Sequence, residues 1–267
     1  GQTTREQIKD RTDSVAQQVQ AFVQQNYSVM ESLAGGTDIR SLDPNLQRKI
    51  LVQAIENNPS FILLYQQDTN GDQTARSSGT LGNRADRWWF LQEMETRKPF
   101  VSKSYFDLNT NEAVTSIVFP VWAENSTSRM TGVLASDLSL SKLQEIVDHY
   151  NDEAIYSIVI DGEGSVIAHT DQNQVKEIYN YKTATKSVQS GGSTAQTAVA
   201  LPEGLTEVAD QALQGKSGLA ELKNMQGEDS IYSYAPVTLP GDSDSWAVLT
   251  VAVKSEVYAA TYRMAYS

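Results

Sequence analysis

The sequence has no cysteine, and its only two histidines are His149 and His169. The lack of cysteine excludes disulfide bonds, thiolate metal sites and cysteine nucleophiles. The two histidines are far apart and form no HExxH motif, so the sequence offers few residues for a histidine-based metal site or a Ser–His–Asp triad. No GxSxG motif occurs. We therefore expect no metal, no cofactor and no enzyme activity.

Long apolar runs and an excess of positive charge are also missing. The longest apolar runs fall far below the ~20 residues of a membrane helix. Lys and Arg number 21 against 33 Asp and Glu, which gives a net charge of −12. Nucleic acids and anionic membrane surfaces would repel such a chain, although one local arginine can still bind a small anion. With 40% hydrophobic residues among 267, the composition is that of a globular protein of one large or two ordinary domains.

The first segment, Thr4–Leu33, has the pattern of a long helix that ends at Gly35-Gly36. At ~1.5 Å per residue it would be ~45 Å long, which suits a stalk that runs along a folded body. A heptad-like subset of its apolar residues also favours weak pairing of two such helices. That subset comprises Ile8, Val15, Phe22 and Val29. The abrupt ends and the absence of a signal peptide suggest a piece of a longer protein.

Two similar runs of elements follow this helix. In each run, strand, tight turn, strand and helix precede three antiparallel strands. The first run has a helix from Asp43-Pro44, strand Phe61–Tyr65, turn Asp68–Asp72, helix Asp86–Arg97, strands Pro99–Phe106, Ala113–Val121 and Gly132–Asp137, and a helix opened by a Ser141/Gln144 capping box. The second has strands Ala154–Ile160 and Ser165–His169, polar loops with a little helix over 171–205, helix Leu205–Leu213, strands Gly218–Lys223, Ser230–Val237 and Trp246–Val253, and helix Lys254–Ala265. The pattern predicts an α+β fold with two stacked antiparallel sheets.

The densest candidate site is Arg87-Trp88-Trp89-Phe90. Aromatic rings beside a guanidinium can wall a cavity and hold a carboxylate or phosphate through two hydrogen bonds. The same residues also fit the start of an amphipathic helix, with the rings in the core and Arg87 on the surface.

Three residues at strand ends complete the candidate set. Tyr105 and Asp107 are two apart and therefore face the same side of a strand, and Asp137 ends another strand. An inward carboxylate is costly unless a ligand cation or a neighbouring donor pairs with it. The alternative is that each aspartate caps the following turn or helix. Asp68-Thr69-Asn70-Gly71-Asp72 lacks the later glycine and glutamate of a calcium loop, so we expect no calcium there.

A series of short motifs, in order along nearly the whole chain, resembles the double Cache sensor domains of bacterial chemoreceptors and sensor kinases. These motifs are the long first helix, Asp68-Thr69-Asn70-Gly71, Arg87-x-Trp89-Phe90, Pro99–Tyr105, Phe119-Pro120-Val121, Gly132–Leu138, Ile160–His169, Gly215–Gly218, Tyr234–Val237 and Trp246-Ala247-Val248. The resemblance implies two PAS-like antiparallel-sheet modules stacked along the first helix. It divides the chain into a stalk helix (1–36), a membrane-distal ligand-binding module (37–150), a membrane-proximal module (151–253) and a helix that leads to the membrane (254–267).

The resemblance also implies a ligand site. Arg87 and Trp89 match residues that hold the ligand carboxylate in amino-acid-binding members, and Asp137 matches the acid that receives the ammonium. Tyr105, Asp107 and Phe90 match further pocket positions. Those members carry a tyrosine where Phe90 stands and another where Gly82 stands, so fewer polar contacts to a carboxylate are expected here. An amino-acid-like molecule, an amine, a small organic acid and a ring stacked on Trp89 all remain open.

We therefore expect the extracytoplasmic sensor domain of a membrane-anchored receptor, used in chemotaxis and homodimeric in the full-length protein. The output could instead be a histidine kinase or a diguanylate cyclase. Two other classes stay open: a hydrolase with a carboxylate pair, and a dimerisation module without a small ligand. In the proximal module, Tyr232, Tyr234 and His169 offer a second pocket or an ordinary core.

Overall fold

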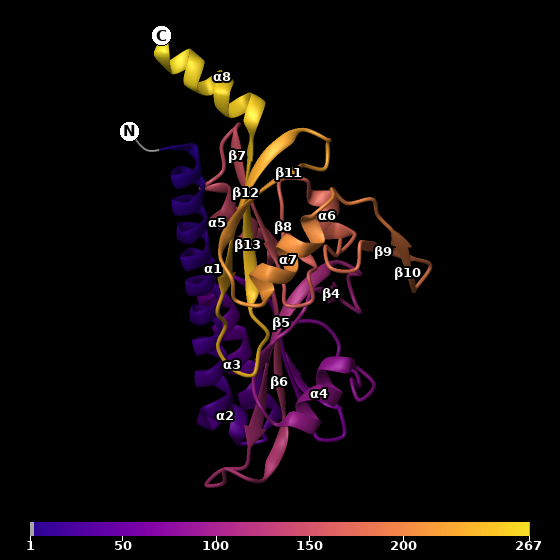
Figure 1. Ribbon diagram of the computed structural model, residues 1–267. Coiled ribbons are helices and arrows are strands. Elements are labelled where there is room, and N and C mark those ends of the chain that lie inside the picture. Colours follow the sequence, from indigo (N-terminus) through magenta and orange to yellow (C-terminus); the bar gives the residue numbers. More distant parts are fainter. Residues whose placement is uncertain (1–2, 267) are drawn as a thin grey trace.

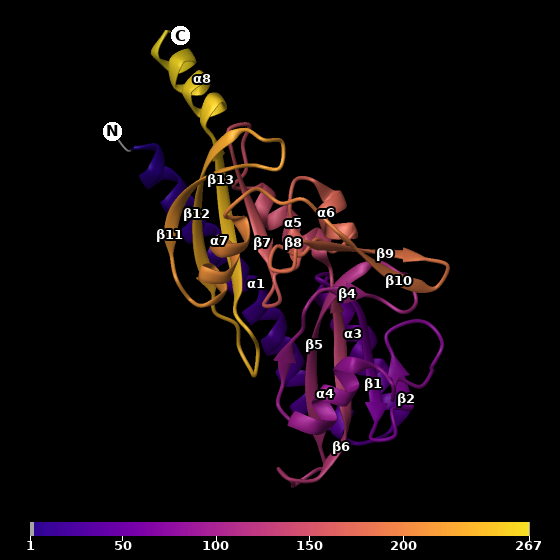
Figure 2. The same cartoon turned by 45° about the vertical axis from the view of Figure 1, so that its right-hand side comes forward.

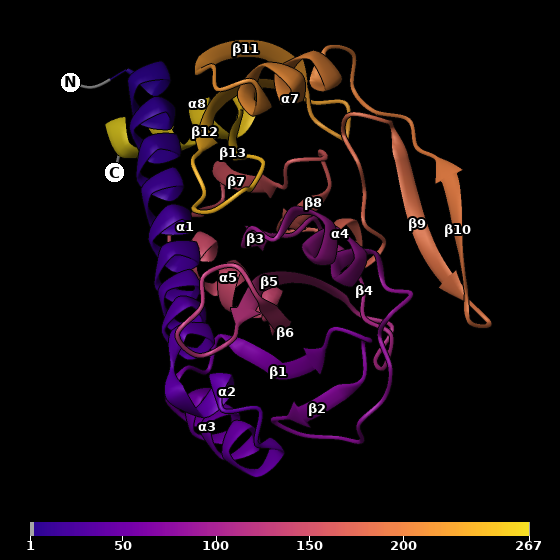
Figure 3. The same ribbon diagram turned by 90° about the horizontal axis from the view of Figure 1, so that it is seen from below.

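Helix α1 (Thr4–Gly35) forms the spine of the molecule, and both sheets pack against it (Figures 1 and 3). The computed structural model describes residues 3–266, with the backbone alone at 260–262. Thr3 and Glu6 cap the start of α1 reciprocally, as a capping box does. The predicted long helix is confirmed, and it ends at Gly35 rather than Leu33.

The first sheet and its helices form what we call the N-terminal module. Its strand order is β2-β1-β6-β5-β3, antiparallel throughout, with β4 also paired to β5. Its elements are α2 (Thr37–Arg40), α3 (Pro44–Asn57), β1 (Phe61–Asp68), β2 (Gln73–Arg76), α4 (Trp88–Thr96), β3 (Phe100–Val101), β4 (Tyr105–Phe106), β5 (Ala113–Trp122), β6 (Met130–Leu138) and α5 (Leu140–Asp148).

The second sheet, in what we call the C-terminal module, has the order β11-β12-β13-β7-β8. Its elements are β7 (Ile155–Ile160), β8 (Val166–Ala168), α6 (Gln172–Lys176), β9 (Thr185–Ser190), β10 (Ser193–Ala198), α7 (Leu205–Leu213), β11 (Gly218–Lys223), β12 (Asp229–Val237), β13 (Trp246–Val253) and α8 (Lys254–Ala265). If β4 and the separate hairpin β9–β10 are left out and the second sheet is followed from β8, the strands of each module are ordered second, first, fifth, fourth, third. The predicted α+β architecture of two stacked modules is therefore confirmed, and Figure 2 shows the two sheets one above the other.

Side chains alternate between the two faces of the first sheet, so one face packs against α1 and the other faces α4. On β6, Leu134 and Leu138 join the large core around α1, whereas Val133 and Ala135 join a second cluster with Trp89. Asp137 follows the odd-numbered residues and so lies on the α4 face. The same alternation on β1 and β5 sends Leu63, Tyr65, Val114 and Val118 to that face.

Three local predictions differ from the structure. The cap of α5 is Ser139, whose hydroxyl accepts the Lys142 N–H, and not Ser141. The single strand expected over Pro99–Phe106 is broken into β3 and β4, because Ser102–Ser104 turn toward the other module. The polar stretch 171–205 contains the hairpin β9–β10 in addition to loops and the short helix α6.

The apolar series of α1 that suggested helix pairing is used inside this chain. Ile8, Val15 and Phe22 are buried against the protein's own sheets. They therefore give no support to a paired helix. The two ends of the chain lie at the same end of the molecule (Figure 1). Among residues 3–266, no helix combines the length and apolar character that a bilayer span requires.

Candidate functional site

A small enclosed pocket lies on the α4 face of the first sheet. Its walls come from β1, the β2–α4 loop, the start of α4 and the turn after β4. The lining residues are Leu63, Tyr65, Arg76, Arg84, Arg87, Trp89, Tyr105, Asp107, Leu108 and Asn109. Its free volume is about 10 Å³, which accommodates no more than a water molecule. A larger ligand must therefore displace the turn or the side chains at the mouth.

Asp137 lies beneath the residues that line this pocket and is only 2% exposed. Its Oδ1 accepts a hydrogen bond from Tyr65 Oη at 2.7 Å and another from Ser116 Oγ at 3.1 Å. Ser116 uses its single hydroxyl proton for Asp137, so the hydroxyl of Tyr105, 2.6 Å away, is the donor to Ser116. Two tyrosines of the pocket wall are thus joined to one buried carboxyl.

Burial raises the pKa of the Asp137 carboxyl to about 7. The hydrogen bond from Tyr65 lowers this pKa in part, and the nearby charge of Asp107 raises it again. No salt bridge joins Asp137 to any basic side chain within residues 3–266. A buried acid without a cation is a suitable acceptor for a ligand ammonium, because the ammonium would stabilise its ionised form.

Arg87 is the N-cap of α4 and lies half-buried at the pocket wall. Its guanidinium carbon is 6.0 Å from the centre of the Tyr105 ring. Trp89 is buried, and its ring contacts that of Tyr65 edge to face at 5.5 Å. The guanidinium comes from the start of α4 and the buried acid from β6, and Tyr105 and Ser116 connect the two.

The remaining two predicted residues have mixed roles. Asp107 lines the pocket, but its Oδ2 also accepts the N–H and the hydroxyl of Thr110 and so caps the turn after β4. Asp107 therefore caps the turn and also borders the pocket, and its binding of a ligand stays a prediction. Phe90 is buried, contacts Trp89 edge to face and supports the pocket from the core, outside its lining.

Sequence reasoning missed Tyr65, Ser116, Arg76 and Arg84. The alternation of Leu63 and Tyr65 on β1 was a usable signal for Tyr65, because both face α4. Ser116 carried no such mark among the small residues of β5. Arg76 and Arg84 lie in a stretch without periodicity, so only the fold brings them to the pocket.

Two sets of hydrogen bonds connect this site with the C-terminal module. Oδ2 of the fully buried Asp161 accepts the backbone N–H of Ser104, next to Tyr105, at 2.7 Å. The β12–β13 loop reaches the segment after α4, where Asp242 N–H donates to Pro99 O and Val101 N–H donates to Ser243 Oγ, both at 2.8 Å. The segments next to α4 and β4 are therefore hydrogen-bonded to the residues that follow β7 and precede β13.

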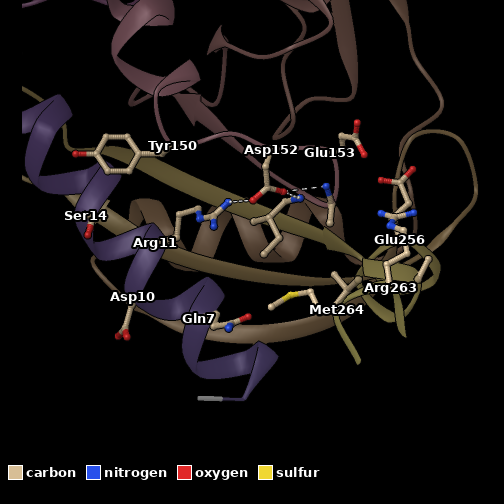
Figure 4. A pocket seen from close by; sticks show the side chains of 14 residues that line it. Gln7, Asp10, Arg11, Ser14, Tyr150, Asp152, Glu153, Glu256, Arg263 and Met264 are labelled. Carbon is tan, nitrogen blue, oxygen red and sulfur yellow. Dashed lines mark hydrogen bonds and ion pairs between the residues drawn. The ribbon is translucent and has the colours of Figure 1, made fainter. Parts of the chain in front are cut away.

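A much larger hollow, of about 1220 Å³, lies between α1, the segment before β7 and α8 (Figure 4). Arg11 of α1 reaches Asp152 across it at 2.9 Å, and Glu256 and Arg263 of α8 stand on its far side. The side chain of Asp152 is half-exposed, and water already solvates its charge. This hollow therefore lacks the buried, uncompensated charge that marks the smaller pocket.

In the C-terminal module, the tyrosines and the histidine proposed for a second pocket are bonded within the module. Tyr232 Oη donates to Lys223 O, and Tyr234 Oη donates to Gln211 Oε1 at 2.6 Å. His169 Nδ1 accepts the Asp171 N–H at 2.8 Å. These contacts favour the core interpretation. The part of the chain that the structure describes holds no cluster of three or more His, Asp and Glu suited to a metal ion.

The family follows from comparison with known sequences. A model described as a Cache domain, dCache_1, matches residues 1–261. The chain belongs to the Cache domain family. The methyl-accepting chemotaxis protein PctB of Pseudomonas aeruginosa is 23% identical over 259 residues, which are 95% of this chain and 38% of PctB. Sporulation kinase D of Bacillus subtilis is 28% identical over 149 residues, 53% of this chain and 29% of the kinase. The Cache chain therefore spans well under half of either relative.

Solved structures show the same fold. The ligand-binding domain of the amino acid chemoreceptor PctB, in complex with L-Arg, superposes with a TM-score of 0.69 at 21% identity, over 94% of this chain and 95% of that one. The ligand-binding domain of the Pseudomonas fluorescens chemoreceptor CtaA, in complex with L-serine, gives 0.67 at 17% identity, over 92% and 95%. These are ligand-binding domains of receptors, and this Cache domain shares their architecture.

Proposed function

We propose that this Cache domain is the extracytoplasmic sensor of a membrane receptor and binds one small polar metabolite in its N-terminal module. Residues 37–150 are then the membrane-distal module and residues 151–253 the proximal one. The observation that carries the proposal is the buried Asp137, without a salt bridge and tied through Tyr65 and Tyr105 to the hollow that Arg87 borders. A carboxylate and an ammonium on one ligand match these two opposite charges.

The proposed contacts follow from the chemistry of the groups. The Arg87 guanidinium receives the ligand carboxylate through two parallel hydrogen bonds, and the ring of Trp89 forms the wall beside it. Asp137, with Asp107 near it, receives the ammonium and gives up its proton. Phe90 holds Trp89 in place from behind. Tyr105 positions Ser116 and thereby Asp137.

The signal would leave the pocket through the contacts between the modules. A ligand that pushes α4 outward moves Pro99 and Val101, which are bonded to the β12–β13 loop. That loop continues into β13, and β13 runs directly into α8. A displacement of an ångström or two at α8 is of the size that receptor helices use. The ligand can bias the two states only by its difference in affinity for them.

PctB supports a chemotaxis output, and sporulation kinase D supports a kinase output, so the signalling partner is proposed only as the cytoplasmic part of a receptor. Homodimerisation of the full-length receptor is part of the proposal, but the buried face of α1 is not its interface.

We further propose binding without turnover. Asp107 and Asp137 lie close enough to interact, as the two carboxylates of a hydrolase would, but Asp107 Oδ2 is bonded within its own turn. Mass spectrometry of the ligand after prolonged incubation is expected to show it unchanged.

The test is a thermal-shift screen of amino acids, amines and small organic acids, followed by the variants Asp137→Ala and Arg87→Ala. Each variant is expected to abolish the ligand-induced shift while far-ultraviolet circular dichroism shows an intact fold. Glu124→Gln and Arg48→Ala, at exposed positions outside the pocket, are matched controls that should keep the full shift. A full shift in both pocket variants would mean that the ligand binds elsewhere.

A further inference from the structure

Three guanidinium groups, those of Arg76, Arg84 and Arg87, line the same small pocket. Within residues 3–266, no salt bridge joins any of the three to an acid. Such a cluster is unexpected in a chain with 33 acidic and 21 basic residues, in which carboxylates are plentiful. One arginine suffices for one ligand carboxylate, so two positive charges remain to be explained.

Arg76 is the most informative of the three, because it is only 7% exposed. Its Nε donates to Ser78 O at 2.8 Å, and its Nη1 donates to Gln73 Oε1 at 3.2 Å. Both acceptors are neutral, so they orient the guanidinium without compensating its charge. Burial and the neighbouring charge of Arg84 lower the pKa of Arg76, and the charges of Asp137 and Asp107 offset this only in part. A buried cation held in this way is costly until an anion pairs with it.

The backbone of the β2–α4 loop is shaped to admit these groups. A Cβ atom at Gly82 would lie 2.6 Å from Nη1 of Arg84, and one at Gly79 would lie 3.1 Å from Nη2 of Arg76. Gly79 also has φ of +81°, which favours glycine. Glycine at both places leaves the space beside the pocket to the two guanidinium groups.

The two acids of the site form no salt bridge with the arginines, although the charges of Asp137 and Asp107 raise the pKa of Arg76 in part. Asp137 Oδ1 is occupied by Tyr65 and Ser116, and Asp107 Oδ2 by the turn that follows it. If the proposed function holds, the ligand carboxylate pairs with Arg87 and the ligand ammonium with Asp137. Arg76 and Arg84 then still lack a directly paired anion on the side of β2.

We infer that the ligand carries a second anionic group, which binds between Arg76 and Arg84. This inference rests on the proposed function and narrows it to one class: short α-amino acids whose side chain ends in a carboxylate or a phosphate. The neutral amides and alcohols of the same shape are poor ligands, because they leave two buried or half-buried cations unpaired.

The test is isothermal titration calorimetry of the chain with matched probes. L-Glutamate and L-aspartate are compared with L-glutamine and L-asparagine, O-phospho-L-serine with L-serine, and glutarate serves as a dianion without an ammonium. At least one acidic amino acid is expected to bind 30-fold or more tightly than its neutral partner. Arg84→Gln should reduce that preference to about threefold or less, and Arg48→Gln, which removes the same charge from an exposed site, should leave it unchanged.

Each result that contradicts the expected affinities points to a different part of the proposal. If the neutral amides or serine bind as tightly as the acidic probes, the second anionic subsite is wrong and the proposed function stands. If glutarate binds as tightly as L-glutamate, the subsite stands and the role of Asp137 is wrong. If no dianionic probe binds at 10 mM, the inference is overturned.

A second measurement needs no ligand. Like charges around one hollow repel each other, so Arg84→Gln is expected to raise the melting temperature of the ligand-free protein relative to Arg48→Gln, by about 1–3 °C. A lower melting temperature in Arg84→Gln than in Arg48→Gln would show that Arg84 has a structural role and would overturn the inference.

Discussion

The two modules share one strand order and differ in what their sheets carry. In the N-terminal module the fifth strand, β6, ends in Ser136-Asp137-Leu138, and its neighbours add Tyr65 and Ser116 on the same face. In the C-terminal module the fifth strand, β13, is buried at every position and has no charged residue. The difference shows that the fold supplies a scaffold, whereas a few polar side chains on one face make a site.

The hydroxyl groups of the two modules differ in the same way. Tyr65 and Tyr105 direct their hydroxyls toward a buried acid at a pocket. Tyr232 and Tyr181 direct theirs to a backbone carbonyl and to the amide of Gln174, within the module itself. These tyrosines of the C-terminal module are thus satisfied by neutral groups, whereas Tyr65 and Tyr105 are tied to a buried carboxyl beside a pocket that three guanidinium groups line.

The largest change in the free energy of unfolding is expected from substitution of Glu93, which lies on α4 and is fully buried. Burial raises the pKa of its carboxyl to about 9, and its Oε1 has no hydrogen-bond partner. Its stabilising contribution is complete below the unfolded pKa of about 4.5 and is lost as the pH rises toward 9. Glu93→Gln should therefore stabilise the protein by about 2–4 kcal/mol at pH 8 and by little at pH 4.5.

Urea unfolding at the two pH values measures this difference, and Glu124→Gln, at an exposed glutamate, is the control. A gain for Glu93→Gln that is equal at pH 4.5 and pH 8 would show that ionisation of the buried carboxyl is not what destabilises the protein.

A matched pair of tyrosines sharpens the comparison between the modules. Tyr65→Phe removes a hydrogen bond that lowers the pKa of Asp137, so ligand affinity is expected to fall about tenfold, or about 1.4 kcal/mol. Tyr232→Phe also removes one buried hydroxyl, but one bonded to Lys223 O, and should leave affinity unchanged. Calorimetric titration of both variants measures their ligand affinities. Equal losses of affinity would contradict the functional difference between the two sheets.

Ligand affinity should depend on pH through Asp137. Its pKa of about 7 in the free protein means that an ammonium must displace a proton when it binds below pH 7. Affinity is expected to weaken about tenfold per pH unit below 7, or about 1.4 kcal/mol. Titration at pH 6 in buffers of different ionisation enthalpy should show proton release. Proton uptake, or a constant affinity from pH 6 to pH 8, would exclude Asp137 as the ammonium acceptor.

The smallest change in stability is expected in the C-terminal module. There, burial of His169 makes the protein less stable as the pH falls, whereas burial of Glu93 makes it less stable as the pH rises. Burial lowers the pKa of His169 to about 4, so its contribution to stability is complete above about pH 6.5 and is lost as the pH falls toward 4. His169→Asn keeps an acceptor for the Asp171 N–H and does not titrate. It should reduce the loss of stability between pH 7 and pH 5 by about 1 kcal/mol. An unchanged loss in chemical denaturation would assign the acid sensitivity to other groups.

Sequence patterns predicted the elements whose signal is local and periodic. Helix α1 and strands β11 and β13 follow apolar spacing or strong β-formers, and their predicted bounds agree closely with the structure. The hairpin β9–β10 was missed because β10 is exposed along its whole length and carries no alternation of apolar residues. Ser139 and Ser141 are equally good caps by composition, and only the backbone decides between them.

The site was predicted in part for the same reason. Arg87, Trp89, Tyr105 and Asp107 belong to compact motifs, and the structure places them around one pocket. Tyr65 and Ser116 reach Asp137 through the pairing of β1 and β5 with β6, which no local pattern reveals. Arg76 ends the short strand β2 and Arg84 lies in the loop that follows, so the closed fold rather than sequence spacing brings them to the pocket.

The four tryptophans offer the most direct test of where the ligand binds, because Trp89 lines the pocket of the N-terminal module and Trp246 lies in the C-terminal module. Their indole N–H signals in a spectrum of the ¹⁵N-labelled protein can be assigned by single Trp→Phe variants of Trp88, Trp89, Trp122 and Trp246. On titration with the strongest stabiliser of the thermal screen, the Trp89 signal is predicted to move most, and Asp137→Ala should abolish that movement. A titration in which the Trp89 signal stays fixed while that of Trp246 moves would contradict the account.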